Sequence, residues 1–236
     1  MTDPRLVQTI SIVLSTFLLV FFVQVPAAAQ DSLRHKGGKH NGDHYKHSFE
    51  NPERYADDWN DPARDEWQKP DAVLDAMGVE EGMTVADLGT GTGYFVPHLA
   101  GAVGENGRVL AVDIEPAMLE YVARLAEKRD LANIDTIRAE PSNSQLPEAS
   151  VDRILTVNVW HHIPDRAAYS EHLASRLADG GSVWVVDFTK EAPMGPPVRH
   201  RLSPNTIVEE LEAGGLQAEV VDVGLPNQFV VVGRPE

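Results

Sequence analysis

Three glycines alternate with two threonines over residues 89–93, directly after a short apolar run that holds one acidic residue. The run 84–88 has the β-branched and apolar composition of a strand, and residues 94–102 have the pattern of a helix. Glycine is needed in such a turn because the turn requires positive φ and because a side chain would keep a ligand away from the backbone. The amino end of the helix offers free N–H groups to the polar end of that ligand. The pattern therefore predicts a ligand site at a junction of strand, turn and helix.

A second strand is expected over residues 108–112, and it ends in Asp113. A carboxylate at the tip of the neighbouring strand can accept hydrogen bonds from both hydroxyls of a ribose. A solvated loop aspartate is the alternative. The position of Asp113 directly after the run Val-Leu-Ala-Val favours the ribose role.

A nicotinamide dinucleotide site would show the same two features, so the spacing of the glycines decides between the ligands. The dinucleotide pattern G-x-G-x-x-G, started at Gly89, needs a third glycine where Tyr94 stands. Started at Gly91, it needs one where Val96 stands. Neither register fits, so a dinucleotide is not the expected ligand.

The pattern that is present, Asp-Leu-Gly-Thr-Gly-Thr-Gly over residues 87–93, resembles the glycine motif of the class I S-adenosylmethionine-dependent methyltransferases. The resemblance covers nearly all of the chain after the linker (30–47) and looks like a bacterial branch of the family, many of whose members carry leaders. The stretches that carry it are 67–70, 82–87, 93–95, 112–119 and 180–183. It implies S-adenosylmethionine as the cofactor and no resident metal.

The resemblance also implies a role for individual residues. Asp87 would orient the glycine turn and the methionine amino group, Asp113 would hold the ribose, and Ile114 would pack on the adenine. Glu140, after the third strand, would accept from the adenine amino group, or it is a surface turn residue. The implied cofactor-binding residues are Asp87, Gly89, Thr90, Gly91, Gly93, Tyr94, Asp113, Ile114, Glu140 and Asn158.

Two histidines, His161 and His162, follow the expected fourth strand at the position that faces the substrate in this family. Methyl transfer needs the acceptor to be aligned and, where the acceptor carries a proton, needs that proton to be removed. Histidine suits this task because its pKa lies near neutrality. Either histidine is therefore a candidate catalytic base, with His162 the preferred one. The alternative is that the pair caps or supports the next helix.

Alternating strands and helices predict a doubly wound, mostly parallel α/β sheet. Further strands are expected over 135–139, 151–157, 182–186, 217–223 and 228–232, and helices over 165–177 and 203–213, the last with Ser203 as its N-cap. The short link 224–227 implies an antiparallel hairpin between the last two strands. The resemblance implies a Rossmann-like sheet of seven strands in the order 3-2-1-4-5-7-6, with only strand 7 reversed.

The chain is expected to divide into four parts, which are 1–29, 30–47, 48–69 and 70–236. The first, apolar and ending in three alanines, is a signal peptide that is cleaved near Ala29, or else an uncleaved membrane anchor. The protein is therefore expected to be exported, periplasmic or secreted, or to be anchored to the inner membrane, with membrane contact only if the leader stays. A His/Gly/Lys-rich linker follows, then an N-terminal lid segment, then the methyltransferase domain.

The composition excludes several classes of function. The chain carries 36 acidic and 20 basic residues, a formal charge of −16, and such a field repels nucleic acid. It has no cysteine, so it has no thiolate metal site and no means of binding arsenite for methylation. The expected loop 190–202 carries three basic side chains, Arg199, His200 and Arg201. These side chains either orient an anionic acceptor or are solvated.

The sequence therefore predicts an S-adenosylmethionine-dependent methyltransferase that acts on a small-molecule or lipid-like acceptor. An isoprenoid quinone precursor is the alternative acceptor. A non-catalytic module that binds the cofactor is the alternative from another class of function. The sequence leaves the acceptor atom and the oligomeric state open.

Overall fold

A computed structural model of the chain describes residues 49–236. The predicted leader (1–29) and linker (30–47) lie outside the described residues. Among the helices of the described part, none combines the length and the apolar character needed to cross a bilayer.

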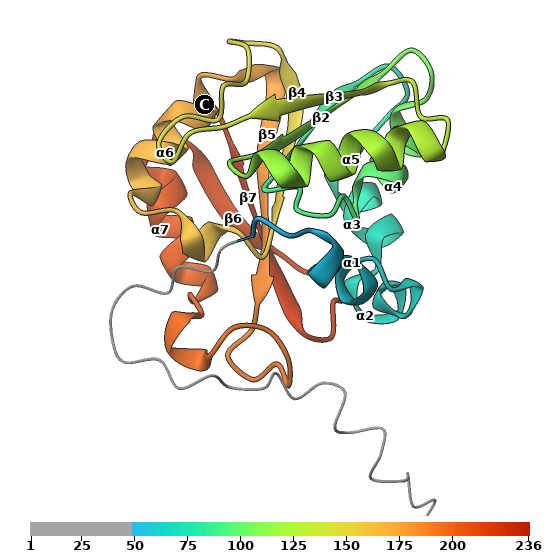
Figure 1. The fold of residues 1–236 in the computed structure, drawn as a ribbon. Helices are drawn as coiled ribbons and strands as arrows, with labels where there is room; N and C mark the ends of the chain where they lie inside the picture. Colours follow the sequence, from blue (N-terminus) through green and yellow to red (C-terminus); the bar gives the residue numbers. More distant parts are fainter. Residues whose placement is uncertain (1–48) are drawn as a thin grey trace, which may run out of the picture. The chain divides into compact units, whose positions relative to one another are not determined.

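The described chain forms a seven-stranded sheet flanked by helices (Figure 1). The strands are β1 (Thr84–Leu88), β2 (Arg108–Asp113), β3 (Ile134–Arg138), β4 (Val151–Val157), β5 (Leu177–Phe188), β6 (Gln217–Val221) and β7 (Gln228–Arg234). Their order is β3-β2-β1-β4-β5-β7-β6. Neighbouring strands from β3 to β5 are parallel, whereas β7 runs antiparallel to both β5 and β6. The predicted order and the reversal of strand 7 are confirmed.

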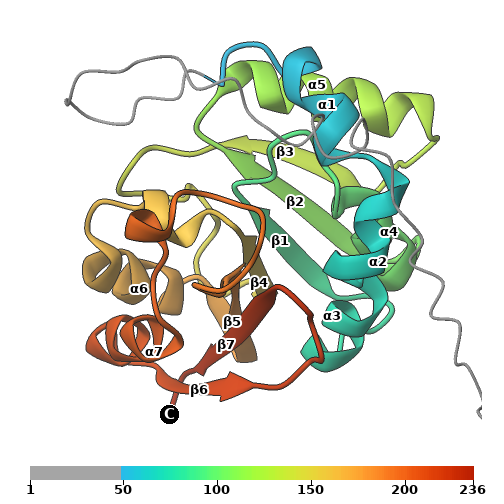
Figure 2. The same cartoon turned by 90° about the horizontal axis from the view of Figure 1, so that it is seen from below.

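Helices cover both faces of the sheet because its central strands are apolar on both sides (Figure 2). The helices and 3-10 turns are α1 (Glu53–Trp59), η2 (Pro62–Arg64), α2 (Asp65–Gln68), α3 (Pro70–Met77), α4 (Val96–Val103), α5 (Pro116–Lys128), η3 (Trp160–His162), α6 (Arg166–Ala174), η4 (Val198–His200) and α7 (Pro204–Ala213). Ala86 and Leu88 of β1 pack with α6 and α7, and Val85 packs with α3 and α4 on the other face.

The ends of two predicted elements differ from the structure. The helix expected over 165–177 ends at Ala174, because Leu177 already begins β5. That strand, expected over 182–186, continues to Phe188, so Asp187 lies within the strand rather than in a loop after it. The predicted cap of the last helix is confirmed, since the Ser203 side chain accepts from the Thr206 N–H.

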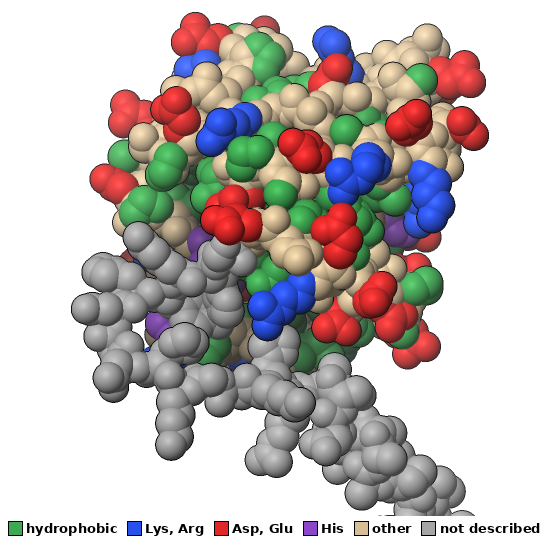
Figure 3. Space-filling model, viewed as in Figure 1, with side chains coloured by type: hydrophobic (Ala, Val, Ile, Leu, Met, Phe, Trp, Pro, Cys, Tyr) green, Lys and Arg blue, Asp and Glu red, His purple; other side chains and the backbone are tan. Residues whose placement is uncertain are grey.

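The face of the domain seen in Figure 3 carries many Asp and Glu side chains. Lys and Arg side chains lie singly among them on that face. This mixture follows from the excess of 36 acidic over 20 basic residues in the chain.

Candidate active site

The glycine turn after β1 packs closely against two segments that are distant in the sequence. Gly89 has a φ of 75°, and a Cβ there would lie 2.4 Å from a methyl carbon of Val159, which follows β4. Gly91 has a φ of 54°, and a Cβ there would lie 3.2 Å from the Trp59 ring. Both positions therefore exclude a side chain, through the left-handed backbone and through the close neighbour.

Asp87, at the end of β1, is buried directly beneath this turn. Its carboxylate accepts a hydrogen bond of 2.8 Å from the Thr90 hydroxyl, which connects Asp87 to the glycine turn. Burial raises the pKa of Asp87 to about 6, and the hydrogen bond from Thr90 opposes that rise. A cation placed beside this carboxylate would lower its pKa again, because an opposite charge favours the ionised form. The predicted contact with the methionine amino group stays a prediction.

Asp113, at the end of β2, lies beside the same turn. One carboxylate oxygen accepts from the Gly91 N–H at 2.9 Å, and the other accepts from the Glu115 N–H at 3.0 Å. Burial raises the pKa of Asp113, and these backbone hydrogen bonds oppose the rise. The next side chain, Ile114, is 50% exposed, which is unusual for its size in this domain. A polar group and an apolar group thus stand side by side, as a ribose and an adenine would require.

Glu140 and Asn158 differ in how the structure holds them. Glu140 is exposed, and its backbone pairs with Asn143 in a tight turn, which matches the surface alternative as well as the adenine role. Asn158, directly after β4, has a φ of 60° and donates its backbone N–H to the Val186 carbonyl at 2.8 Å. Its side-chain oxygen accepts from Gln228 Nε2 at 2.7 Å.

The segment before the domain, residues 49–69, contacts the glycine turn directly. Asn60 donates to the Thr92 carbonyl at 3.0 Å and accepts from the Thr92 hydroxyl at 2.8 Å. The Tyr94 hydroxyl donates to Asp65. The segment predicted as a lid therefore lies on the predicted cofactor site, through side chains that the sequence did not single out.

A chain of buried amides connects that segment to the end of β4. Gln68, fully buried, donates to Gln228 at 2.6 Å, and Gln228 in turn donates to Asn158. Sequence reasoning missed Gln68 and Gln228, because a single glutamine in an apolar stretch reads as a surface position. The only signal was the scarcity of polar residues in the expected strand over 228–232.

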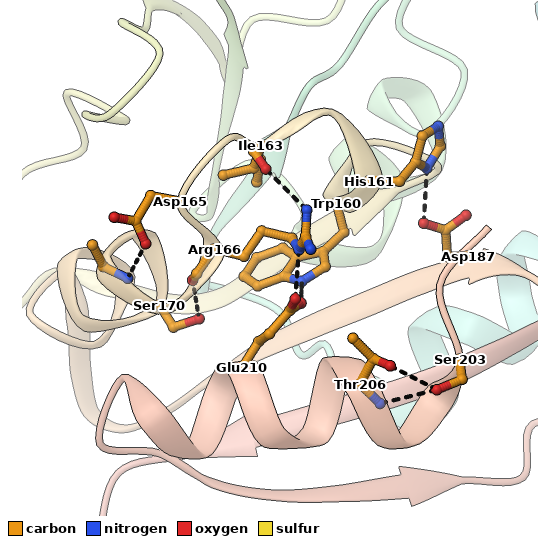
Figure 4. A network of polar contacts seen from close by, with 11 residues as sticks. Trp160, His161, Ile163, Asp165, Arg166, Ser170, Asp187, Ser203, Thr206 and Glu210 are labelled. Atoms are coloured by element: carbon orange, nitrogen blue, oxygen red, sulfur yellow. Dashed lines mark hydrogen bonds and ion pairs between the residues drawn. The ribbon is translucent and has the colours of Figure 1, made fainter. Parts of the chain in front are cut away.

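His161, on the acceptor side of the site, lies close to a buried carboxylate. Its Nδ1 lies 2.9 Å from Asp187 Oδ2, and the two side chains are only 5% and 1% exposed (Figure 4). The other oxygen of Asp187 accepts from the Phe188 N–H at 2.8 Å. A carboxylate only accepts, so the proton of the neutral ring lies on Nδ1 and the lone pair on Nε2.

His162 occupies a different environment. It is exposed, its ring centroid lies 4.2 Å from that of His161, and Phe49 meets it edge-on at 6.3 Å. The contact with Asp187 therefore makes His161 the histidine with an orienting carboxylate on which a base role can be argued, whereas the preference for His162 stays a prediction. Nothing in the sequence pattern distinguished the two.

The 3-10 turn η3 that carries both histidines is anchored from below. Trp160 is fully buried and donates from Nε1 to Glu210 of α7 at 2.9 Å (Figure 4). The second oxygen of Glu210 accepts from Arg166 at 2.7 Å, and Arg166 also donates to the Ile163 carbonyl. Because both sides of the turn are fixed, the position of His161 is set by α6 and α7 rather than by local sequence.

Arg201 corrects the expectation for the loop 190–202. This side chain is buried and donates hydrogen bonds to five backbone carbonyls, those of Thr189, Lys190, Ala192, Met194 and Pro196. It is therefore neither solvated nor directed at an acceptor. Arg199 is exposed, so the loop presents one of its two arginines to solvent. Across residues 49–236, no cluster of three His, Asp or Glu side chains could hold a metal ion.

Comparison with known proteins identifies the family. The family model for a methyltransferase domain matches residues 85–181, from β1 into β5. The crystal structure of a SAM dependent methyltransferase from Aquifex aeolicus is 31% identical and superposes with a TM-score of 0.72, covering 78% of this chain and 97% of that one. The chain belongs to the S-adenosylmethionine-dependent methyltransferases.

Curated relatives of this methyltransferase match over shorter stretches. The protein-L-isoaspartate O-methyltransferase of Methanococcoides burtonii is 29% identical over 92 residues, which is 39% of this chain and 45% of that protein. The ubiquinone/menaquinone biosynthesis C-methyltransferase UbiE of Shewanella piezotolerans is 27% identical over 119 residues, 50% of this chain and 47% of that protein. The chain thus spans less than half the length of these two relatives.

S-adenosylmethionine is the cofactor of this methyltransferase, and the residues at the glycine turn fit it. Glycine at positions 89 and 91 lets the turn adopt positive φ while it packs against Val159 and Trp59, which sets the shape of the turn after β1. Asp113 and Ile114 offer one acceptor and one apolar surface for the nucleoside. Asp87 offers a buried negative charge for an ammonium group.

Proposed function

We propose that this methyltransferase modifies a small-molecule or lipid-like acceptor whose reacting group carries a proton, and that His161 removes that proton. When bound, S-adenosylmethionine supplies a methyl group on a positively charged sulfur. The observation that carries the proposal is the buried hydrogen bond of 2.9 Å between His161 Nδ1 and Asp187. Two buried side chains held in this geometry are the usual arrangement of a base and the group that orients it.

Asp187 would act on His161 in two ways. It fixes the tautomer, so that Nε2 carries the lone pair that takes the proton. It would also stabilise the imidazolium that forms on proton transfer, because the two opposite charges attract at the observed separation of 2.9 Å. Burial strengthens both effects, since water does not screen the pair.

The aromatic rings near His162 favour an acceptor that is flat and apolar. Tyr55 stacks on Trp59 with a centroid distance of 4.7 Å, and Phe49 lies 5.7 Å from Tyr55 and 5.9 Å from Trp59. Phe49 also contacts His162. Aromatic side chains bind flat apolar molecules well because they bury a large area with little loss of entropy. We therefore assign the segment 48–69 a second task, which is to cover the acceptor as a lid.

A second candidate acceptor, more specific than the first, is an isoprenoid quinone precursor. The similarity to UbiE, a ubiquinone/menaquinone biosynthesis C-methyltransferase, favours it. A base suits this acceptor, because loss of the hydroxyl proton raises the electron density on the neighbouring ring carbon. The same base would serve methylation at oxygen, so the histidine does not choose between the two.

We further propose that residues 1–29 direct the chain out of the cytoplasm or to the inner membrane. The apolar run followed by three alanines supports export. Amino-terminal sequencing of the fractionated native protein tests this. A start near Gln30 indicates cleavage, and an intact start in the membrane fraction indicates an anchor. An intact start in the soluble cytoplasmic fraction would contradict both.

The function is tested by screening acceptors for conversion of S-adenosylmethionine to S-adenosylhomocysteine. Phenols, quinols and their prenylated forms are offered to the full-length protein and to the His161→Ala variant. We expect turnover with at least one hydroxylated ring compound and its loss in the variant. Calorimetric binding of S-adenosylhomocysteine without turnover of any acceptor would instead favour a non-catalytic module, and NAD binding of equal strength would contradict the cofactor site.

A further inference from the structure

Arg64 is a cation near the glycine turn that the proposed mechanism does not use. It ends the 3-10 turn η2, and its guanidinium carbon lies 3.9 Å from the centroid of the Tyr94 ring. Tyr94 directly follows the last glycine of the turn. The Arg64 guanidinium therefore lies beside the part of the site assigned to the methionine moiety.

The hydrogen bonds of Arg64 leave part of its donor capacity unused. Nη1 donates to the Trp59 carbonyl at 2.9 Å, and Nε and Nη2 both donate to Gln68 Oε1, at 3.3 and 3.0 Å. Three of the five guanidinium N–H groups are thus engaged. The other two have no acceptor among residues 49–236, and no carboxylate of that range lies within ion-pair distance of Arg64.

Arg201 is a buried arginine whose donors are engaged within the protein. Its five hydrogen bonds all end on backbone carbonyls of residues 189–196. Arg64 is partly buried, and burial lowers the pKa of its guanidinium to about 10. It differs from Arg201 in lacking acceptors for two donors. A desolvated cation with spare donors is favoured only where an anion completes its surroundings.

Asp87 indicates which anion that is. The charge of Asp87 raises the pKa of Arg64 against the effect of burial, and the charge of Arg64 lowers that of Asp87, so the two groups act on one another. Asp87 accepts a hydrogen bond from Thr90 of the glycine turn, and Arg64 stacks on Tyr94 directly after the turn, so a negative and a positive charge both lie against it. This is the complement of a zwitterion, an ammonium and a carboxylate on one carbon.

We propose that Arg64 binds the carboxylate of the amino-acid part of the cofactor, while Asp87 faces its ammonium group. Because Arg64 also holds Trp59 and Gln68, the bound carboxylate stabilises the N-terminal segment on the glycine turn. Cofactor binding and ordering of this segment are then coupled. The inference rests on cofactor binding at the glycine turn and not on the identity of the acceptor.

The test compares two ligands by calorimetry on the full-length protein. One is S-adenosylhomocysteine, and the other is its decarboxylated analogue, in which a hydrogen replaces the carboxylate. We expect Arg64→Gln to weaken binding of S-adenosylhomocysteine by about tenfold or more and to change binding of the analogue by less than about twofold. Arg64→Lys, which keeps the charge without the planar fork, should give an intermediate loss for S-adenosylhomocysteine only.

Arg124→Gln is the matched control, because Arg124 is an exposed arginine that also contacts the segment, through Glu53 at 3.0 Å. It should bind both ligands as the parent does. An equal loss of both ligands in Arg64→Gln would overturn the proposal and leave Arg64 a support for the segment. Equal affinity of the parent for the two ligands would overturn it as well. If the parent bound neither ligand, the cofactor site itself, and the proposed function with it, would fail.

If Arg64→Gln does not fold, as judged by circular dichroism, Arg64→Lys decides. Loss confined to S-adenosylhomocysteine in that variant supports the proposal, and loss of both ligands or of neither overturns it.

Discussion

The two sides of the site are built in different ways. On the cofactor side, Asp87, Thr90 and Gly91 stand within five positions of one another, and Asp113 ends the adjacent strand. On the acceptor side, His161 pairs with Asp187 from the next strand, and η3 is held by Glu210 from α7. The cofactor side is thus a local motif, whereas the acceptor side is assembled from distant parts. A shared cofactor and a variable acceptor are compatible with this division, because distant parts can change without disturbing the motif.

The two sides meet where Gly89 packs against Val159. A substitution at Gly89 therefore tests whether the two sides depend on one another. Gly89→Ala should reduce the free energy of unfolding by about 2 to 6 kcal/mol, because it adds both backbone strain and overlap with Val159. Urea denaturation measures this. Gly82→Ala is the matched control, since Gly82 has a φ of 89° and no atom within 4 Å, so it adds strain alone. Equal losses in the two variants would show that the contact does not matter.

His161→Ala probes the acceptor side alone. We expect turnover to fall by about 100-fold or more while the dissociation constant of S-adenosylhomocysteine stays nearly the same, since the base acts on the acceptor. Steady-state kinetics with an acceptor from the screen, together with calorimetry, measures both. His162→Ala should have a mild effect, and Asp187→Asn should lower turnover by about tenfold or more. A larger loss in His162→Ala than in His161→Ala would reverse the assignment.

Asp113→Ala probes the cofactor side alone. It should weaken S-adenosylhomocysteine binding by about 1.5 to 3 kcal/mol, the usual range for a hydrogen bond to a charged group. Calorimetry measures the loss, with circular dichroism to check the fold. Glu140→Ala is the comparison within the same region and should cost less, because Glu140 is exposed. Unchanged affinity in a folded Asp113→Ala protein would remove Asp113 from the site.

The pH dependence of cofactor binding sharpens the role of Asp87. Its folded pKa is raised to about 6, so the carboxylate is ionised above that pH and is protonated as the pH falls through it. Affinity for S-adenosylhomocysteine should be full near pH 8 and fall by up to about tenfold per unit below pH 6. Asp87→Asn should bind more weakly and flatten this profile. A parent profile that stays flat down to pH 5 would contradict a charge contact at Asp87.

The same raised pKa has an opposite consequence for the free protein. Between about pH 4 and pH 6, the folded protein keeps a proton on Asp87 that the unfolded chain has released. The free energy of unfolding therefore falls as the pH rises through this range, and the loss is complete above about pH 6 and absent near pH 4. Asp87→Asn should therefore raise the midpoint of thermal unfolding at pH 8 but not at pH 4. A destabilised variant at pH 8 would show that the Thr90 contact outweighs the burial of charge.

The order of the sheet was predictable because strands and helices alternate regularly and because the glycine turn resembles a known motif. The predicted edges were less accurate where one element passes directly into the next, as at Leu177. The extension of β5 to Phe188 placed Asp187 inside the sheet, where it pairs with His161. A local pattern does not show this, because the strand ends where its partner β7 stops pairing, at Gln228.

The sequence by itself determined the glycine turn and the acidic residue at the end of the second strand, which depend on neighbours in the chain through the period of a strand or the backbone freedom of glycine. The order of the seven strands followed from the resemblance to the methyltransferases. Only the tertiary structure decided that His161 meets Asp187, why Arg201 needs no ligand and where Arg64 lies. Those choices depend on the register of β4 with β5 and on contacts such as that of Gln68 with Gln228, 160 positions away. Hydrogen bonds between distant residues require a fixed distance and angle, and the folded sheet alone supplies them.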